Sequence, residues 1–414
     1  MDLDVSFVRR QFPAFAQPEL ADWSFFENAG GSYACAATID ALHQYYVHTK
    51  VQPYGPYPAS TAAGEAMDRS RRRWSEALGV AADEVLFGPS TTANAYVLAH
   101  ALAPALGPGV RVVVTNQDHE ANTGTIRRVA TAAGAEVVEW RIDPATGLLD
   151  PARLAPLLTP DTALVAMPHC SNIVGMENDV AAVAALVHDV GARLVVDGVS
   201  FAPHGLPDVA ALDADLYLFS LYKVYSVHQG LMVVRNGWLD ELPNQGHFFN
   251  ADQPSKRLTP AGPDHAQEAA AGAVLDYVEL LHRHHGGGEG DGLATAARSV
   301  SELWQRHEQR LLGPLLTMLA GSDRVRMLGP AEATTDRHRC PTVAFVPLAR
   351  TPEAVATGLA DHGIMAGFGD FYANRVLDGL DVAPERGVVR VSFVHYTSEG
   401  DLDRLLAALD AELG

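Results

Sequence analysis

The 414-residue sequence is poor in lysine and cysteine, and it has no long apolar run. Its three lysines are Lys50, Lys223 and Lys256, so arginine supplies nearly all of the 30 positive charges. Against 50 acidic residues this leaves a formal net charge of −20, which argues against a surface for nucleic acid or anionic membrane. The apolar runs are too short to cross a bilayer. Three widely spaced cysteines give neither a metal-type pair nor an even disulfide set, and no metal site is expected.

The composition that remains is that of a folded protein with a large core. Hydrophobic residues make up 48% of the chain and charged residues 19%, which excludes a disordered protein. The length suggests two domains, or one large domain with a smaller one appended. The acidic start, Met1-Asp2-Leu3-Asp4, lacks the basic and apolar segments of a signal peptide, and we expect a cytoplasmic protein.

The order of apolar runs and helical patterns predicts an α/β fold. Strands alternate with helices from Glu84 to Asp197, which is typical of a mostly parallel sheet covered on both faces. After Asn250 the pattern changes to long helices, including one over Ala266–Leu281, with strands near 342–345 and 388–393 and a last helix over Glu399–Leu413. We therefore expect an N-terminal arm (1–20) packed against the small domain, a large domain (21–265), and an inter-domain helix with a small α+β domain (266–414).

Lys223 has an unusual position. It lies between the apolar runs Leu216–Phe219 and Leu231–Val234, both of which predict buried strands. Burial there would lower the pKa of the amine and favour a neutral nucleophile, the form that makes a Schiff base. The alternative is a lysine whose charged end reaches solvent from the end of a strand.

Other polar residues follow predicted strands in the same way, and the carboxyl ends of parallel strands are where ligands bind. They are the turn Ser90-Thr91-Thr92, then His119, Asn172 and Asp197. The turn offers hydroxyls and free amides at a helix N-terminus, which suits a phosphate. An acid at the end of a buried strand needs a partner.

Pyridoxal phosphate uses each of these groups. Its phosphate takes the helix N-terminus, its aldehyde takes a lysine, and its pyridine nitrogen takes a carboxylate that keeps the ring an electron sink. An imidazole can stack on the ring, and an amide can bond the phenolic oxygen. Neither a Walker-type phosphate loop nor a dinucleotide fingerprint is present in the sequence.

From Phe26-Glu27-Asn28-Ala29-Gly30 to Val389-Arg390-Val391-Ser392-Phe393, the chain resembles the class V aminotransferase family. These are fold-type I pyridoxal-phosphate enzymes that include cysteine desulfurases. The resemblance implies a large domain with a mostly parallel seven-stranded sheet between helices, and a smaller α+β C-terminal domain. It also implies an amino-acid substrate and a homodimer with active sites at the subunit interface.

The resemblance assigns roles residue by residue. The cofactor-binding set it implies is Thr91, Thr92 and Ser220 for the phosphate, His119 for ring stacking, Asn172 and Ser200 for the phenolic oxygen, Asp197 for the pyridinium, Lys223 for the Schiff base, and its neighbour Tyr222. Lys223, His119 and Asp197 would be catalytic. The substrate-binding set it implies is Arg390 for the carboxylate, with Asn28, Ala29 and Tyr372.

The chain also departs from the family pattern. Tyr222 replaces the usual histidine before the lysine, Ser226 replaces a glycine, and Gly262 lies where many relatives carry a phosphate-binding threonine donated across the dimer. The loop Gly367–Tyr372 lacks the persulfide cysteine of desulfurases. Cys340 lies at a predicted strand start and Cys170 lies off the loop, so sulfur relay is rejected.

The sequence thus predicts a pyridoxal-phosphate enzyme acting on an α-amino acid. Aromatic residues in place of the cysteine loop favour a C–S (β) lyase acting on an S-substituted cysteine. An aminotransferase and a decarboxylating or oxidative deaminase remain alternatives, because all three reactions use the same residues. A non-catalytic binding protein on the same fold is the alternative from another class.

Overall fold

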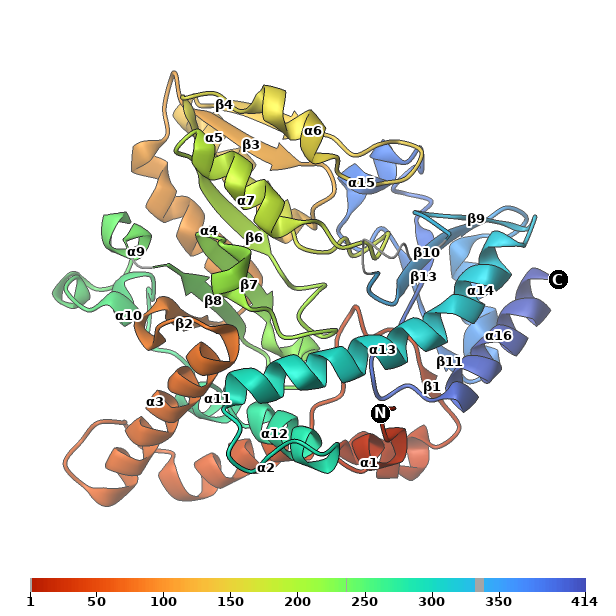
Figure 1. Cartoon of the computed structure of the whole chain (residues 1–414), viewed down its shortest axis with the longest axis horizontal. Coiled ribbons are helices and arrows are strands. Elements are labelled where there is room, and N and C mark those ends of the chain that lie inside the picture. The colour runs from red at the N-terminus through yellow and green to blue at the C-terminus, as the bar shows by residue number, and fades with distance from the viewer. Residues whose placement is uncertain (1, 236, 332–338) are drawn as a thin grey trace.

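The computed structural model describes residues 2–235, 237–331 and 339–414, and its largest feature is a seven-stranded sheet (Figure 1). Across the sheet the strands are β2 (Val85–Gly88), β8 (Gly230–Val234), β7 (Leu216–Ser220), β6 (Arg193–Asp197), β5 (Thr162–Pro168), β3 (Arg111–Thr115) and β4 (Glu136–Trp140). Among these seven, β8 runs antiparallel to β2 and β7 on either side of it, and the other neighbouring pairs are parallel. The predicted mostly parallel sheet is confirmed.

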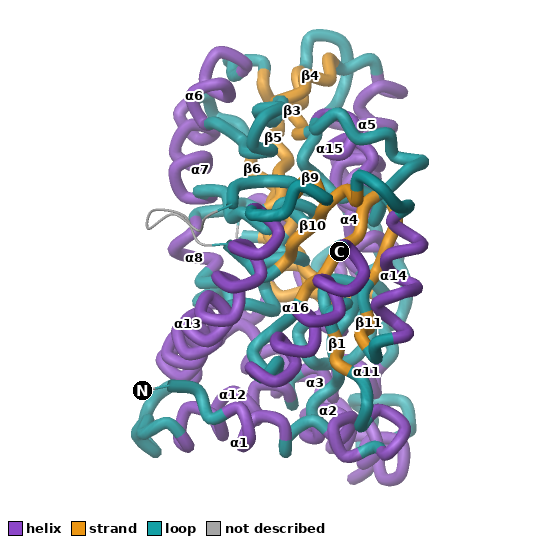
Figure 2. The backbone as a smooth tube through the Cα atoms, turned by 90° about the vertical axis from the view of Figure 1, so that its right-hand side faces the viewer, coloured by secondary structure: helices purple, strands orange, loops and turns teal. Residues whose placement is uncertain are grey.

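Helices cover both faces of this sheet because its strands are apolar on both sides (Figure 2). Leu164 and Ala166 of β5 belong to one cluster with α4 (Thr91–Leu102) and α5 (Glu120–Ala133). Val165 and Met167 belong to the opposite cluster with α7 (Val180–Asp189) and α3 (Pro58–Leu78). The alternation along one strand thus builds two cores.

A second, smaller core lies beside the first. A four-stranded antiparallel sheet has the order β12 (Gly367–Gly369), β13 (Val388–Ser392), β10 (Thr342–Pro347) and β9 (Val325–Met327). Val343 and Phe345 of β10 pack with α14 (Pro352–Asp361) and α16 (Glu399–Leu413). The last helix has the predicted bounds.

The long helix α13 (Leu293–Ala320) joins the two cores (Figure 1). Val300 and Trp304 in its first half belong to the core of the large sheet, whereas Leu312 and Leu316 in its second half belong to the smaller core. The N-terminal arm also contacts both parts. Arg9 forms an ion pair with Asp401 of α16 at 2.5 Å, and the Phe12 ring packs edge-on against Tyr225 and Tyr277.

Shorter elements complete the fold. They are α1 (Val5–Arg9), α2 (Ala36–Gln44), α6 (Pro151–Leu154), α8 (Val209–Leu212), α9 (Trp238–Glu241), α10 (Pro254–Arg257), α15 (Asn374–Gly379), and a parallel pair of β1 (Ser24–Phe25) and β11 (Ile364–Met365). No helix in the described ranges is both long and apolar enough to cross a membrane.

The single helix predicted over Ala266–Leu281 is wrong. The structure has two helices, α11 (His265–Ala271) and α12 (Val274–His284), which are separated at Gly272 and Ala273. Gly272 packs so closely on α3 that an added Cβ would lie 2.8 Å from the Cα of Ser70. Packing and the low helix propensity of glycine outweigh the helical pattern on either side.

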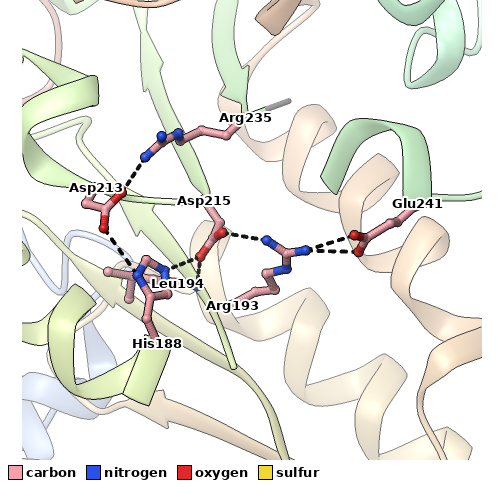
Figure 3. Close-up of polar contacts among 7 residues, drawn as sticks. All are labelled: His188, Arg193, Leu194, Asp213, Asp215, Arg235 and Glu241. Atoms are coloured by element: carbon pink, nitrogen blue, oxygen red, sulfur yellow. Dashed lines mark hydrogen bonds and ion pairs between the residues drawn. The ribbon is translucent and has the colours of Figure 1, made fainter. Parts of the chain in front are cut away.

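An ionic cluster lies at the amino ends of β6 and β7, opposite to the ends that carry the predicted site residues (Figure 3). The buried carboxylate of Asp215 accepts hydrogen bonds from the Leu194 amide at 2.8 Å and from Arg193 at 3.0 Å, and it lies 2.8 Å from Nε2 of His188. Arg193 also binds both carboxylate oxygens of Glu241 at 3.0 Å. This cluster fixes the two central strands at one end.

Candidate active site

One cavity at the carboxyl edge of the large sheet gathers every residue predicted to bind the cofactor. Its empty volume is about 490 Å³, including the open mouth. The predicted residues that line it are Thr91, Thr92, His119, Asn172, Asp197, Ser200, Ser220, Tyr222 and Lys223. They come from the ends of β2, β3, β5, β6 and β7, because the carboxyl ends of parallel strands meet along one edge.

Lys223 ends a 3₁₀ turn, Leu221–Lys223, directly after β7. The turn is closed by the Val224 amide, which donates to the Leu221 carbonyl at 2.9 Å, and the chain then reverses at Tyr225, whose φ is +59°. The Leu221 amide donates to the Gln229 carbonyl at 2.8 Å and so closes the wider loop. The lysine is 8% exposed. Burial, reinforced by the nearby charge of Arg390, lowers the pKa of Lys223 to about 8. About a tenth of the amine is therefore neutral at pH 7, far more than for an exposed lysine.

Asp197 is the last residue of β6 and is buried. Its Oδ1 accepts one hydrogen bond, from the Val199 amide at 2.9 Å. Burial raises the pKa of Asp197 to about 6, although the Val199 bond and Lys223 oppose this rise. Among the described residues no arginine, lysine or histidine forms an ion pair with it. A buried carboxylate without an ion-pair partner is stabilised when a cationic ligand group binds beside it. A protonated pyridine nitrogen is such a group.

His119 begins α5 as its N-cap, and its Nδ1 accepts a hydrogen bond from the Ala121 amide at 3.1 Å. Burial, with further contributions from Lys223 and Arg390, lowers the pKa of His119 to about 4. The ring is therefore neutral at pH 7, and its Nδ1 is held as an acceptor. A neutral imidazole in this cavity suits stacking on an aromatic cofactor.

The predicted phosphate end lies where α4 begins. Ser90 is the N-cap of this helix, and its hydroxyl accepts from the Ala93 amide at 3.1 Å. The hydroxyls of Thr91 and Ser220 lie 2.7 Å apart. Gly230 packs directly on the backbone of Ser90 and Thr91, where a Cβ would overlap them. Paired hydroxyls at the N-terminus of a twelve-residue helix form a suitable cradle for an anion.

Asn172 lines the cavity, and Arg390 lies next to it. The Nδ2 of Asn172 donates to the Phe371 carbonyl at 3.0 Å, while its Oδ1 is buried without a hydrogen-bond partner in the described residues. Arg390, on β13, donates from Nη1 to the Asn172 carbonyl at 3.2 Å and from Nη2 to Oε1 of Glu27 at 2.8 Å. Its Cζ lies 3.7 Å from the centre of the Phe371 ring. Arg390 is therefore beside the cavity but not free.

The segment carrying Phe371 and Tyr372 lies beside the cavity, although neither residue is among those that line it. Both residues have positive φ, at 52° and 55°, which is uncommon for aromatic side chains. The Tyr372 carbonyl accepts from the Glu120 amide at 2.8 Å, and its exposed ring lies 5.4 Å from that of His119. The strained backbone places one aromatic ring on Arg390 and the other beside His119.

Asn28 and Ala29 do not line this cavity. Asn28 donates from Nδ2 to the carbonyls of Phe25 and Ser392, and its Oδ1 accepts from the Tyr396 hydroxyl. The Ala29 amide donates to the Ser392 hydroxyl at 2.8 Å. Both residues thus join the segment that follows β1 to β13. Their predicted contact with substrate stays a prediction.

Three further residues were not assigned from the sequence. Gln117 and Cys170 also line the cavity, and Glu27 pairs with Arg390. Glu27 stands in the quoted motif Phe26–Gly30, but its partner is 363 residues away and no local signal connects them. Cys170 packs with Cys340 and Phe201, and both cysteines are buried.

The positions that depart from the family pattern lie around the same site. The Tyr222 ring lines the cavity and stacks on His228, with centroids 4.7 Å apart. Ser226 is buried, and its hydroxyl lies 3.5 Å from the Ala271 carbonyl. Gly262 belongs to a loop that lines a second cavity, with an empty volume of about 950 Å³, behind the Ser90–Thr92 turn.

Comparison with known proteins places these features in a family. The family model described as aminotransferase class-V matches residues 24–249 and 290–405. An aminotransferase-like protein of Gibberella zeae is 33% identical over 98% of both chains. A nonribosomal peptide synthetase-like enzyme of Aspergillus fumigatus is 29% identical over 98% of this chain, although the match covers only 26% of that protein. The apo structure of cysteine desulfurase from Thermococcus onnurineus NA1 is similar over 99% of this chain and 98% of that one, with a TM-score of 0.86 at 24% identity.

Proposed function

The chain belongs to the aminotransferase class-V family of pyridoxal-phosphate enzymes, and within it we propose a C–S lyase that acts on an S-substituted cysteine. The proposed reaction converts the substrate and water to a thiol, pyruvate and ammonium. Lys223 would hold the cofactor aldehyde, Asp197 its ring nitrogen, and the Thr91–Ser220 hydroxyl pair its phosphate. Each of these residues lines the same cavity.

When bound, the cofactor supplies an electron sink for the bond-breaking step at the substrate Cα. Lys223 would be the base for that carbon, because it is the one lysine that lines the cavity and its pKa is lowered to about 8. Its neutral amine would accept the Cα proton. Loss of the sulfur substituent from Cβ as a thiolate would then follow, and the thiolate would take up a proton.

The observation that supports a lyase rather than a desulfurase is the segment Gly367–Tyr372. Where resemblance to desulfurases leads us to expect a persulfide cysteine, the chain has Phe371 over Arg390 and Tyr372 beside His119. Cys170 lines the cavity but is buried, with its thiol directed to the Gly175 carbonyl at 3.3 Å. Aromatic rings beside the cavity suit a substrate with a large sulfur substituent.

An aminotransferase is the second candidate, because the Gibberella zeae relative is named aminotransferase-like and matches the chain from end to end. Transamination would use the same lysine and the same carboxylate-binding arginine. The two reactions differ in their products, since transamination leaves the amino group on the cofactor.

We also propose that two copies of the chain form a homodimer with the active sites at the interface. Phe248 and Phe249 are 87% and 67% exposed, and Tyr96 on α4 is exposed as well. The second cavity, which opens between the Ser90–Thr92 turn and the Gly262 loop, is mainly apolar in its lining. Exposed aromatic residues and an apolar cavity both suit a protein interface. Light scattering on the purified protein gives the molar mass directly.

The test of the proposed reaction is a substrate panel on the holoenzyme. S-substituted cysteines should yield equal amounts of pyruvate, ammonium and thiol. Alanine, which has no leaving group at Cβ, serves as the matched control and should yield none of them. Conversion of the cofactor to its amine form by alanine would identify an aminotransferase, and release of carbon dioxide would identify a decarboxylating deaminase.

A further inference from the structure

The fork of Arg390 is partly occupied by the protein itself. Its Nη2 donates to Glu27 at 2.8 Å and its Nη1 donates to the Asn172 carbonyl at 3.2 Å. Its Nε is buried and has no hydrogen-bond partner in the described residues. Phe371 covers one face of the guanidinium at 3.7 Å. A carboxylate that binds this arginine in the bidentate manner needs two N–H groups on one edge, and the Glu27 carboxylate already holds an N–H group of Nη2.

Glu27 is held loosely compared with the arginine. Its side chain is 28% exposed, whereas that of Arg390 is 3% exposed. Oε1 accepts the hydrogen bond from Arg390, but Oε2 is buried with no hydrogen-bond partner in the described residues. A Cβ added at Gly367 would lie 2.5 Å from Oε2, so the glycine makes room for the carboxylate. Glu27 therefore has one good bond in this position and an exposed side to move toward.

We propose that Glu27 is a resident counter-ion which an incoming carboxylate must displace from Arg390. The inference rests on the proposed role of Arg390 in binding the substrate carboxylate. Two carboxylates at one guanidinium repel each other, so binding of the second requires release of the first. Glu27 thereby lowers the affinity of the site for every carboxylate, and the substrate must recover this cost from its other contacts.

This displacement makes Glu27 a specificity residue. Ligands that carry a carboxylate but cannot bind the rest of the site are discriminated against, whereas amines without a carboxylate leave the Glu27–Arg390 pair intact. An amino acid with a large side chain gains further contacts with the aromatic segment that carries Phe371 and Tyr372. Small carboxylates gain none, and they should bind poorly.

The test compares Glu27→Gln with the natural protein by isothermal titration calorimetry on the holoenzyme. The probe is 3-phenylpropionate, which has a carboxylate and no amine and so cannot react with the cofactor. We expect the variant to bind it roughly ten- to one-hundredfold more tightly, the range for loss of one competing charge-assisted hydrogen bond. The matched ligand 3-phenylpropan-1-ol, which lacks the carboxylate and also has no amine to react with the cofactor, should bind both proteins equally. Glu27→Ala repeats the measurement without an amide at this position.

Two protein controls accompany these variants. Glu120→Gln removes a carboxylate near the cavity mouth that pairs with Arg128 and Arg375 and does not touch Arg390, and it should change carboxylate binding by no more than about twofold. In an Arg390→Lys background, which keeps the charge but removes the fork, Glu27→Gln should give much less gain.

The outcomes separate the possible roles of Glu27. Unchanged or weaker binding of 3-phenylpropionate by Glu27→Gln and Glu27→Ala would overturn the proposal, because it is the result for a residue that only positions Arg390. An equal gain for the alcohol and the carboxylate would overturn it as well. A protein without the visible absorbance of the bound cofactor would instead refute the proposed function, and the calorimetric comparison would remain readable.

Discussion

Replacing Asp197 should have opposite effects in the two forms of the protein. It should stabilise the cofactor-free protein and impair the holoenzyme. Burial raises the pKa of this carboxyl from its ordinary value of 3.8 to about 6. The folded protein thus binds the proton more tightly than the unfolded chain does, and it loses stability as the pH rises toward and through 6. The difference of about 2.2 between the two pKa values corresponds to a loss of about 3 kcal/mol of folding free energy at pH 7.

Asp197→Asn removes this ionisation while keeping an oxygen to accept from the Val199 amide. In cofactor-free protein, prepared by treatment with hydroxylamine, the variant should unfold in urea at pH 7 with a free energy about 3 kcal/mol higher than that of the natural protein. The gain should fall below about 1 kcal/mol at pH 4, where the natural carboxyl is protonated when folded. Asp118, a second buried acid, has its pKa raised to about 8 and is mostly protonated throughout this range.

In the holoenzyme the same substitution should act in the opposite direction. An amide cannot keep the pyridine nitrogen protonated, so cofactor affinity and turnover should both fall. A cofactor-free Asp197→Asn protein that is no more stable than the natural one at pH 7 would refute the view of Asp197 as a buried, unpaired charge. A gain of equal size at pH 4 and pH 7 would refute the electrostatic cause.

Three other predictions follow from the site and the fold. Lys223→Ala should lose both activity and the visible absorbance of the bound cofactor, and reconstitution of the cofactor-free natural protein should accelerate as the pH rises through about 8, where the amine loses its proton. Thr91→Ala should weaken cofactor binding by roughly tenfold in equilibrium dialysis, because one hydroxyl of the pair with Ser220 is lost, whereas Thr91→Ser should retain most of the affinity. Asp215→Ala should lower the free energy of unfolding by about 3 kcal/mol because it leaves Arg193 and the Leu194 amide without their buried acceptor, whereas the exposed Asp213→Ala should cost less than about 1 kcal/mol.

Local patterns in the sequence were sufficient to predict the large sheet and its edge. Each strand there is a short apolar run, and the polar residue that follows it lies at the carboxyl end of the strand. Lys223, Asp197 and His119 could be predicted to meet because a parallel sheet brings such ends together whatever the lengths of the connections. Their roles stay predictions, while the fold and the cofactor class are confirmed.

What the sequence did not predict depends on contacts between distant segments. Glu27 and Arg390 are 363 residues apart, and their pairing requires the segment that follows β1 to lie against β13. The break at Gly272 depends on how closely α3 approaches the glycine. Helix propensities carry no information about that distance. The positive φ angles of Phe371 and Tyr372 are likewise set by the bonds that Asn172 and the Glu120 amide make with this segment.

The most direct test of the central claim is the stoichiometry of products from one S-substituted cysteine. The holoenzyme should release thiol, pyruvate and ammonium in a ratio of one to one to one over many turnovers, with the cofactor absorbance unchanged at the end. The Lys223→Ala protein should release none of them. Formation of alanine with transfer of sulfur to the protein, or loss of the cofactor absorbance after a single turnover without thiol release, would contradict a C–S lyase.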